Sequence, residues 1–167
     1  HLLKAGHQNI AFVSPAYENT STIEERIEGY RNALADGGVV VDPKICFNQL
    51  FSTLPPAFEA DKTHKDLEAL RAHFELYPQI TAVVASEYNA ALLVYEALRQ
   101  LDRRNDVKIA CFDYPHHALR APLFTYIRQD ETGMARLAID ILLKRLAKES
   151  VPLHHIVPHT LVEVEPS

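Results

Sequence analysis

Short apolar runs alternate along this chain with longer segments in which apolar residues recur every three or four positions. Runs of the first kind predict strands, and segments of the second kind predict amphipathic helices. The predicted strands are 9–14, 44–51, 80–85, 106–112, 124–128 and 156–164. The predicted helices begin at 21 or 22, at 61 or 63, at 88 and at 131, and they end near 36, 76, 101 and 148. This alternation is typical of an α/β three-layer sandwich, with a mainly parallel sheet and helices on both faces.

Composition narrows the class of protein. The chain has 167 residues, of which 47% are hydrophobic and 23% charged, as in ordinary globular proteins. The length suits one domain or one and a half smaller lobes. A formal net charge of −5 argues against a face that binds nucleic-acid phosphates in this segment. Cys46 and Cys111 lie in apolar runs, which favours buried thiols in a reducing compartment over a disulfide or a reactive thiol.

The start of the chain and its last third suggest more than one lobe. The first four residues, 1–4, are typical of the last turn of a helix, and Gly6 follows as a C-cap. We therefore expect the sequence to be a piece of a longer protein, with any targeting or DNA-binding segment upstream. Near the end, an irregular segment at 114–122 precedes a strand–helix unit, and the linker 150–152 leads to a lone strand. A chain that crosses between two lobes and back would have this pattern.

Catalytic and metal-binding patterns are absent from the sequence. It contains no G-x-S-x-G elbow, no G-x-G-x-x-G turn and no Walker loop. Nine histidines suggest a metal site, but His155 and His159 on one strand would lie roughly 13 Å apart. His116 and His117 are adjacent, with no acidic partner at ligand spacing. We predict no metal, no cofactor and no enzymatic activity.

Polar residues at strand ends are the best candidates for function. The apolar run 107–112 ends on Asp113, and two other strands end in comparable polar groups. Ligands of open α/β sheets bind at the carboxyl ends of the strands, so this pattern predicts a recognition cleft. Asp113 would accept hydrogen bonds from hydroxyl groups. The alternative is a capping or turn aspartate before Pro115.

Arg26 lies in the first turns of the helix that begins at 21 or 22. Its guanidinium fork matches vicinal hydroxyls or a carboxylate, so we predict that it points into the mouth of the cleft. Arg26 and Asp113 would then supply a donor and an acceptor on opposite sides of a polyol. The alternative is a solvated arginine paired with Glu25 or Glu28.

A set of short motifs, in order along nearly the whole chain, carries a family resemblance. The motifs are HLL..GH..IAF at 1–12, R..GY..AL at 26–34, VDP at 41–43, TAVVA at 81–85, FDY at 112–114, PLFTYIRQ at 122–129 and GM...A at 133–138. Pro158, Leu161 and Glu163 resemble the family's closing segment. Together they resemble the C-terminal part of the effector domain in the lactose/galactose repressor family.

The resemblance implies two periplasmic-binding-protein-like (type I) lobes that hold a small effector between them. Residues 1–121 and 153–167 would form the C-terminal lobe, and residues 122–152 would return to the N-terminal lobe. The rest of that lobe and the DNA-binding head would lie outside the sequence. The implied function is a sugar-sensing, homodimeric module of a cytoplasmic bacterial transcriptional regulator, with DNA bound only through the head. The alternative is a sugar-binding protein of an ABC-type transporter with the same fold.

The resemblance also implies roles for individual residues. Arg26 matches an arginine that contacts the effector. Glu87 and Tyr88 depart from the family's Asn-Asp pair, and a carboxylate, unlike an amide, only accepts hydrogen bonds. Glu87 and Asp113 together would disfavour anionic effectors unless Arg26 compensates. Alternatively, Glu87 lies on the surface and caps the helix that follows.

Other site residues are predicted from position. Phe51 follows the second strand, where relatives place a ring against the sugar, although a core phenylalanine is equally consistent. Tyr17 and Asn19 lie in the loop after the first strand, and Gln129 matches the family's RQ pair beside the cleft.

The helix at 89–101 has apolar side chains nearly all round, so it is either buried or part of an interface. The resemblance implies that Leu92 and Tyr95 contact the partner in a dimer. The alternative is a core helix between the sheet and a neighbouring helix.

Overall fold

Strands and helices alternate along the chain as the hydrophobic pattern predicts. The computed structural model describes residues 1–16, 21–40, 42–51, 60–114 and 121–164. The strands are β1 (Ile10–Pro15), β2 (Phe47–Leu50), β3 (Ala82–Ala85), β4 (Lys108–Phe112), β5 (Thr125–Gln129) and β6 (His159–Val162). The helices are α1 (Ser21–Asp36), α2 (Ala60–Leu76), α3 (Tyr88–Gln100) and α4 (Glu131–Leu146), with one short 3₁₀ helix, η1 (Pro43–Ile45).

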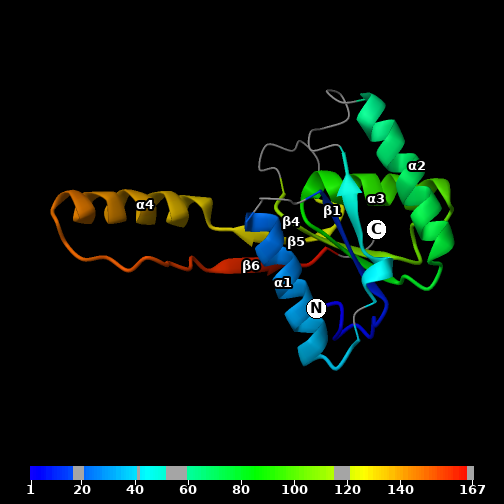
Figure 1. Cartoon of the computed structure of the whole chain (residues 1–167), viewed down its shortest axis with the longest axis horizontal. Helices are drawn as coiled ribbons and strands as arrows, with labels where there is room; N and C mark the ends of the chain where they lie inside the picture. The colour runs from blue at the N-terminus through cyan, green and yellow to red at the C-terminus, as the bar shows by residue number, and fades with distance from the viewer. Residues whose placement is uncertain (17–20, 41, 52–59, 115–120, 165–167) are drawn as a thin grey trace.

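All six strands belong to one sheet in the order β2-β1-β3-β4-β5-β6. Every neighbouring pair is parallel except β5 and β6, which are antiparallel. Helix α1 covers one face of this sheet, and α2 and α3 cover the other (Figure 1). The predicted α/β sandwich with a mainly parallel sheet is confirmed.

The residues of β1 show how the sequence builds three layers. Successive side chains of a strand point to opposite faces. Ile10 and Phe12 accordingly pack with the apolar side of α1, whereas Ala11 and Val13 belong to the core on the α2–α3 side. The hydroxyl of Tyr30 on α1 donates to the Ile10 carbonyl at 2.7 Å, which satisfies its buried polar atom.

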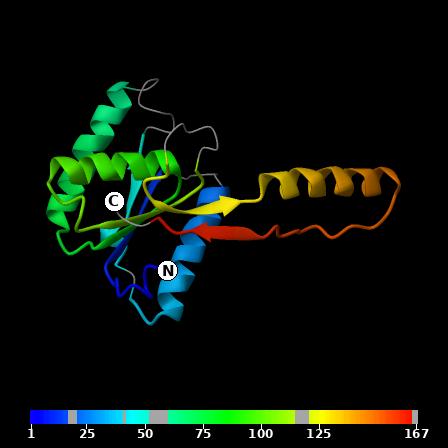
Figure 2. The same ribbon diagram turned by 180° about the vertical axis from the view of Figure 1, so that it is seen from behind.

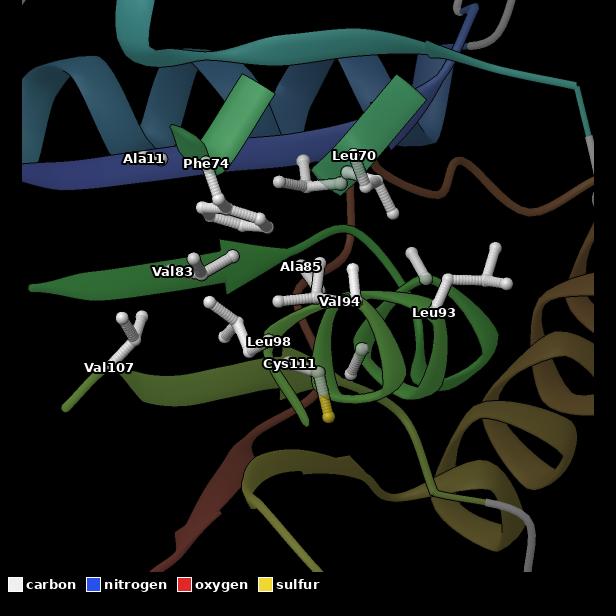
Figure 3. Close-up of a cluster of buried hydrophobic side chains, with 14 of the residues drawn as sticks. Ala11, Leu70, Phe74, Val83, Ala85, Leu93, Val94, Leu98, Val107 and Cys111 are labelled. Atoms are coloured by element: carbon white, nitrogen blue, oxygen red, sulfur yellow. The ribbon is translucent and has the colours of Figure 1, made fainter. Parts of the chain in front are cut away.

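The larger half of the core lies between the sheet and the two helices α2 and α3. Leu70 and Phe74 of α2 and Val94 and Leu98 of α3 gather around Val83 of β3 (Figure 3). These side chains are fully buried. This packing holds α3 against the sheet. The first residues of α3 therefore lie at the carboxyl end of β3.

Several predicted boundaries were wrong. The predicted strand 44–51 begins instead with η1, because Pro43 lacks an N–H and the Asp42 side chain accepts from the Lys44 N–H at 3.0 Å. The predicted strand 156–164 forms only at β6. Helix α1 ends where predicted, and Gly38 takes a φ of +69° beyond its last turn.

Both cysteines are free, and Cys111 is buried. Burial, helped by the nearby Asp113 carboxylate, raises the pKa of the Cys111 thiol to about 12. None of the helices in the described part of the chain combines the length and the apolar character needed to cross a membrane.

Helix α4 and the chain that returns from it form an arm that extends away from the sheet and its covering helices (Figures 1 and 2). Not one residue of α4 is buried. Strand β5, which the sequence analysis assigned to the returning segment from residue 122, pairs with β4 in the main sheet. The predicted boundary at 121/122 is therefore wrong, since the chain leaves the sheet only after Gln129.

Candidate functional site

A cleft of about 950 Å³ opens where β3, β4 and β5 end. Its lining includes six residues from the three strand ends: Glu87, Tyr88, Asp113, Tyr114, Gln129 and Asp130. The rest of the lining comes from Asn89, Arg128, the first residues of α4, and Pro158 and Thr160 at β6. We refer to this hollow as the cleft.

The sheet topology explains why these side chains meet. Strands β3, β4 and β5 are parallel neighbours, so their carboxyl ends lie along the same edge. Glu87 follows β3, Asp113 follows β4, and Gln129 is the last residue of β5. The prediction that polar side chains gather at this edge is thus realised in the structure.

Asp113 is the centre of the polar cluster. Its Oδ2 accepts from the Arg26 guanidinium at 3.0 Å, and its Oδ1 accepts a short hydrogen bond from the Gln129 amide. Its backbone N–H donates to the Ile127 carbonyl at 3.1 Å, and its φ is +63°, in the left-handed region that aspartate tolerates better than most residues. Two strands and one helix therefore fix the orientation of this carboxylate.

Arg26 supports the cluster from α1. Its Nη1 donates to the Ser86 carbonyl at 2.5 Å, and the guanidinium lies 4.6 Å from the centre of the Phe112 ring. The side chain is only 19% exposed. The predicted arrangement, with Arg26 and Asp113 on opposite sides of a ligand, was wrong, because the two side chains contact each other directly. Arg26 also does not line the cleft; it holds Asp113 from behind.

Glu87 lines the cleft just after the end of β3. It occupies the N-cap position of α3, but its side chain makes no capping hydrogen bond, so the capping alternative is wrong. Its Oε1 is buried and has no hydrogen-bond partner among the described residues. Burial raises the pKa of this carboxyl, the Arg26 charge lowers it, and the Asp113 charge raises it further.

A second hollow, of about 670 Å³, lies on the α1 side of the Arg26–Asp113 pair, and we refer to it as the groove. Arg26, Phe112 and Met134 line it, together with the exposed edge of α1. Gln129 and Asp130 border both the groove and the cleft. The junction between β5 and α4 thus separates two adjoining hollows.

Phe51 is a predicted site residue that lies apart from the cleft. Phe51 is 64% exposed and absent from the cleft lining, so it is not a core residue either. Its backbone N–H donates to Oδ1 of Asp66 at 2.9 Å. Tyr17 and its neighbour Asn19 lie outside the described residues.

Two tyrosine rings form an aromatic part of the site that was not predicted from the sequence. Tyr88 and Tyr114 both line the cleft, with ring centres 5.2 Å apart and planes at 84°. The rule that selected Asp113 could have found Tyr114, because it is the next residue after the same strand end. In the described part of the chain, no three His, Cys, Asp or Glu side chains are grouped to hold a metal ion.

The profile of the periplasmic binding protein-like domain family matches residues 1–164. A probable opine utilization operon repressor from Rhizobium rhizogenes is 30% identical over 170 residues, which cover 95% of this chain and 80% of that protein. The chain belongs to the lactose/galactose repressor family.

Solved structures of the family share the fold. The transcriptional regulator CelR–cellobiose complex matches with a TM-score of 0.74 and 23% identity, covering 96% of this chain and 47% of that one. The lac repressor dimer bound to operator and the anti-inducer ONPF matches with a TM-score of 0.75 and 19% identity, covering 98% and 54%. The chain thus spans about half the length of these two family members. The relatives are transcriptional regulators rather than enzymes, which favours a regulator over a transport protein.

Against the family pattern, the departures at Glu87 and Tyr88 both fall inside the cleft. The predicted interface residues of α3 are half-buried: Leu92 and Tyr95 pack at the margin of the core, and the Tyr95 ring lies 5.8 Å from that of Phe124. Helix α3 also packs closely on α2. The inner side of α3 therefore packs in the core, as the alternative prediction stated. The role of Leu92 and Tyr95 in a dimer stays a prediction.

Proposed function

We propose that this chain is the effector-sensing part of a bacterial transcriptional regulator and that the cleft is one half of its effector site. The observation that carries the proposal is the fixed polar cluster at the ends of β3, β4 and β5. Arg26 and Gln129 both donate to the Asp113 carboxylate and hold it in place, so the site needs little rearrangement to accept a ligand. Residues of this kind would bind the hydroxyl groups of a sugar or sugar derivative. The cellobiose complex of a structural relative supports this class of ligand.

The arm supports a second lobe on the open side of the cleft. Helix α4 exposes Ile139, Leu142, Leu143 and Leu146. A helix of this length gains most of its stability by packing its apolar face against other parts of the protein. No residue of α4 is buried, so its apolar face has no such packing within the described residues. We infer that α4 belongs to a second lobe, mostly outside these residues, which would close the cleft.

In this proposal, closure of two lobes around the effector couples ligand binding to DNA binding. The ligand would favour one of two lobe arrangements, and the arrangement would set the spacing of DNA-binding heads in a homodimer. Leu92 and Tyr95 are our candidates for the dimer contact. DNA would be bound through a segment outside this chain, since the net charge of −5 gives these residues little affinity for phosphates.

The test is a thermal-shift screen of sugars on the gene product that carries these residues. A ligand that binds only the native state raises its Tm, and we expect one sugar or sugar derivative to do so. The same ligand should alter binding to operator DNA in a mobility-shift assay. Residues 1–167 alone should show a much smaller shift, because the facing half of the site is absent. Failure of every sugar to raise the Tm of the gene product would contradict the proposal.

An Arg26→Ala variant tests whether ligand binding in this screen depends on the Arg26 side chain. It should lose the ligand-induced shift, because Asp113 loses the partner that orients it. The control is Arg31→Ala, which removes an exposed arginine from the same helix and should keep the full shift.

A further inference from the structure

The charges around the cleft are strongly one-sided. Four carboxylates line it, those of Glu87, Asp113, Asp130 and Glu131, against one cationic side chain, Arg128, among the described lining residues. The Arg26 guanidinium neutralises Asp113, and the carboxylate of Asp130 caps α4 by accepting from the Gly133 N–H at 2.9 Å. Glu87 also feels the Arg26 charge, but its Oε1 accepts no hydrogen bond from the described residues.

Glu87 also has unused hydrogen-bonding capacity. Its Oε1 is buried without a partner in the described part of the chain, and so is the hydroxyl of the fully buried Ser86 beside it. A buried acceptor without a donor is costly. A ligand with N–H groups would recover that cost once the Glu87 side chain, which lines the cleft, turns this oxygen toward it. Hydroxyl groups could do so too, but a charged donor would bind a carboxylate more strongly.

Two tyrosine rings, those of Tyr88 and Tyr114, line the same cleft as Glu87, and we refer to them as the aromatic corner. The Tyr88 and Tyr114 rings meet at 84°, and both line the cleft. The rings of Phe124 and Tyr126 support them, at 5.7 Å from Tyr88 and 5.2 Å from Tyr114 respectively. Faces of tyrosine rings attract cations through their quadrupole, and the attraction grows as the cation is desolvated.

We infer that the effector carries a protonated amine, which binds between the Glu87 carboxylate and the Tyr88–Tyr114 corner. This inference rests on the proposed function of the cleft and narrows its ligand class to amine-bearing sugars or sugar derivatives. The two residues that depart from the family's Asn-Asp pattern are then the two that recognise the amine. Asp113 and Gln129 remain available for the hydroxyl groups of the same ligand.

The experiment compares matched pairs of sugars on the gene product that carries these residues. The probes are glucosamine, galactosamine and mannosamine, each against its neutral parent sugar and its N-acetyl derivative, with affinities measured by calorimetry. For at least one pair we expect the amine to bind at least about tenfold more tightly than both uncharged forms. Equal or tighter binding of a neutral parent would overturn the inference and leave the proposed function standing. Binding of none of the probes would overturn the inference, whereas the sugar-sensing function would fail only if every sugar in the thermal-shift screen also failed.

Three variants at Glu87 and Tyr88, with one control at Glu96, locate the preference. Glu87→Gln keeps the shape of the side chain and should remove most of the tenfold preference, with little change for the neutral sugar. Glu96→Gln makes the same substitution on α3 outside the cleft and should leave both affinities unchanged. Tyr88→Phe should retain the preference and Tyr88→Leu should lose part of it, because only the first keeps an aromatic face. An unchanged preference in Glu87→Gln would overturn the assignment.

Discussion

Arg26 and Asp113 are 87 residues apart in the sequence, and yet Nη2 of the arginine lies 3.0 Å from Oδ2 of the aspartate. The contact links the helix that follows β1 to the loop that follows β4. Through Nη1 the same guanidinium also holds the Ser86 carbonyl, at the end of β3. Arg26 therefore ties together three segments that a parallel sheet brings to one edge, and it orients the site without lining the cleft.

Removal of this side chain should destabilise the fold moderately. Arg26→Ala leaves Oδ2 of Asp113 and the Ser86 carbonyl without the donors that Arg26 supplies, and we expect a loss of about 1 to 3 kcal/mol in the free energy of unfolding. The lower half of this range is favoured because Asp113 is 43% exposed and partly solvated. Urea denaturation measures the change. If Arg26→Ala were no less stable than Arg31→Ala, the tie would have no energetic role.

The backbone conformation of Asp113 should make a glycine variant at this position more stable than an alanine variant. Its φ of +63° is unfavourable for alanine but free of strain for glycine. Asp113→Gly and Asp113→Ala both remove the carboxylate, so their difference isolates the backbone. We expect the glycine variant to be more stable by roughly 1 kcal/mol, the reverse of the usual order. Greater stability of the alanine variant in urea would show that this conformation is not maintained.

Glu87 should reduce stability at neutral pH. Burial raises its pKa above the ordinary 4.5, so it stabilises the fold when protonated and loses that contribution as the pH rises through the folded-state pKa. Glu87→Gln stays uncharged and should therefore have a higher Tm than the wild type at pH 7. The difference should disappear below pH 4.5.

Glu96 provides a control for that experiment, because its pKa is shifted in the opposite direction to that of Glu87. Hydrogen bonds from Arg99 and Gln100 lower the pKa of Glu96 to about 2, so its ionised form stabilises the fold at neutral pH. Glu96→Gln should lower the Tm slightly at pH 7, and this effect should fade as the pH falls from 4.5 to about 2. Identical pH profiles for the two variants would contradict the difference in their surroundings.

Phe74 and Leu76 test the packing of α2. Phe74 is fully buried, whereas Leu76, two positions later, is 68% exposed. Phe74→Ala should cost about 3 to 5 kcal/mol through lost burial and a residual cavity, and Leu76→Ala should stay within about 0.5 kcal/mol of the wild type. Equal effects in thermal or urea unfolding would mean that α2 does not pack on the sheet by this face.

The hydrophobic pattern predicted the class of fold, the order of the elements and most of their positions. The reason is local: period-two and period-3.6 patterns state which side of an element is buried, as the alternation of Ile10, Ala11, Phe12 and Val13 between two cores shows. Element ends were less predictable. Residues 44–51 carry a strand-like apolar pattern, but the Asp42 cap and Pro43 turn the first of them into η1.

The sequence by itself therefore determined that this is a parallel α/β sheet with Asp113 and Gln129 at strand ends, because both follow from local patterns and from family motifs. Only the tertiary structure decided that Arg26 bonds to Asp113 directly, that Phe51 lies apart from the cleft, and that Tyr88 and Tyr114 form one of its corners. Those relationships join side chains from separate elements, and their distances depend on how the strands are ordered and how the helices pack. Periodicity fixes which face a residue occupies, but it carries no information about which distant residue lies opposite.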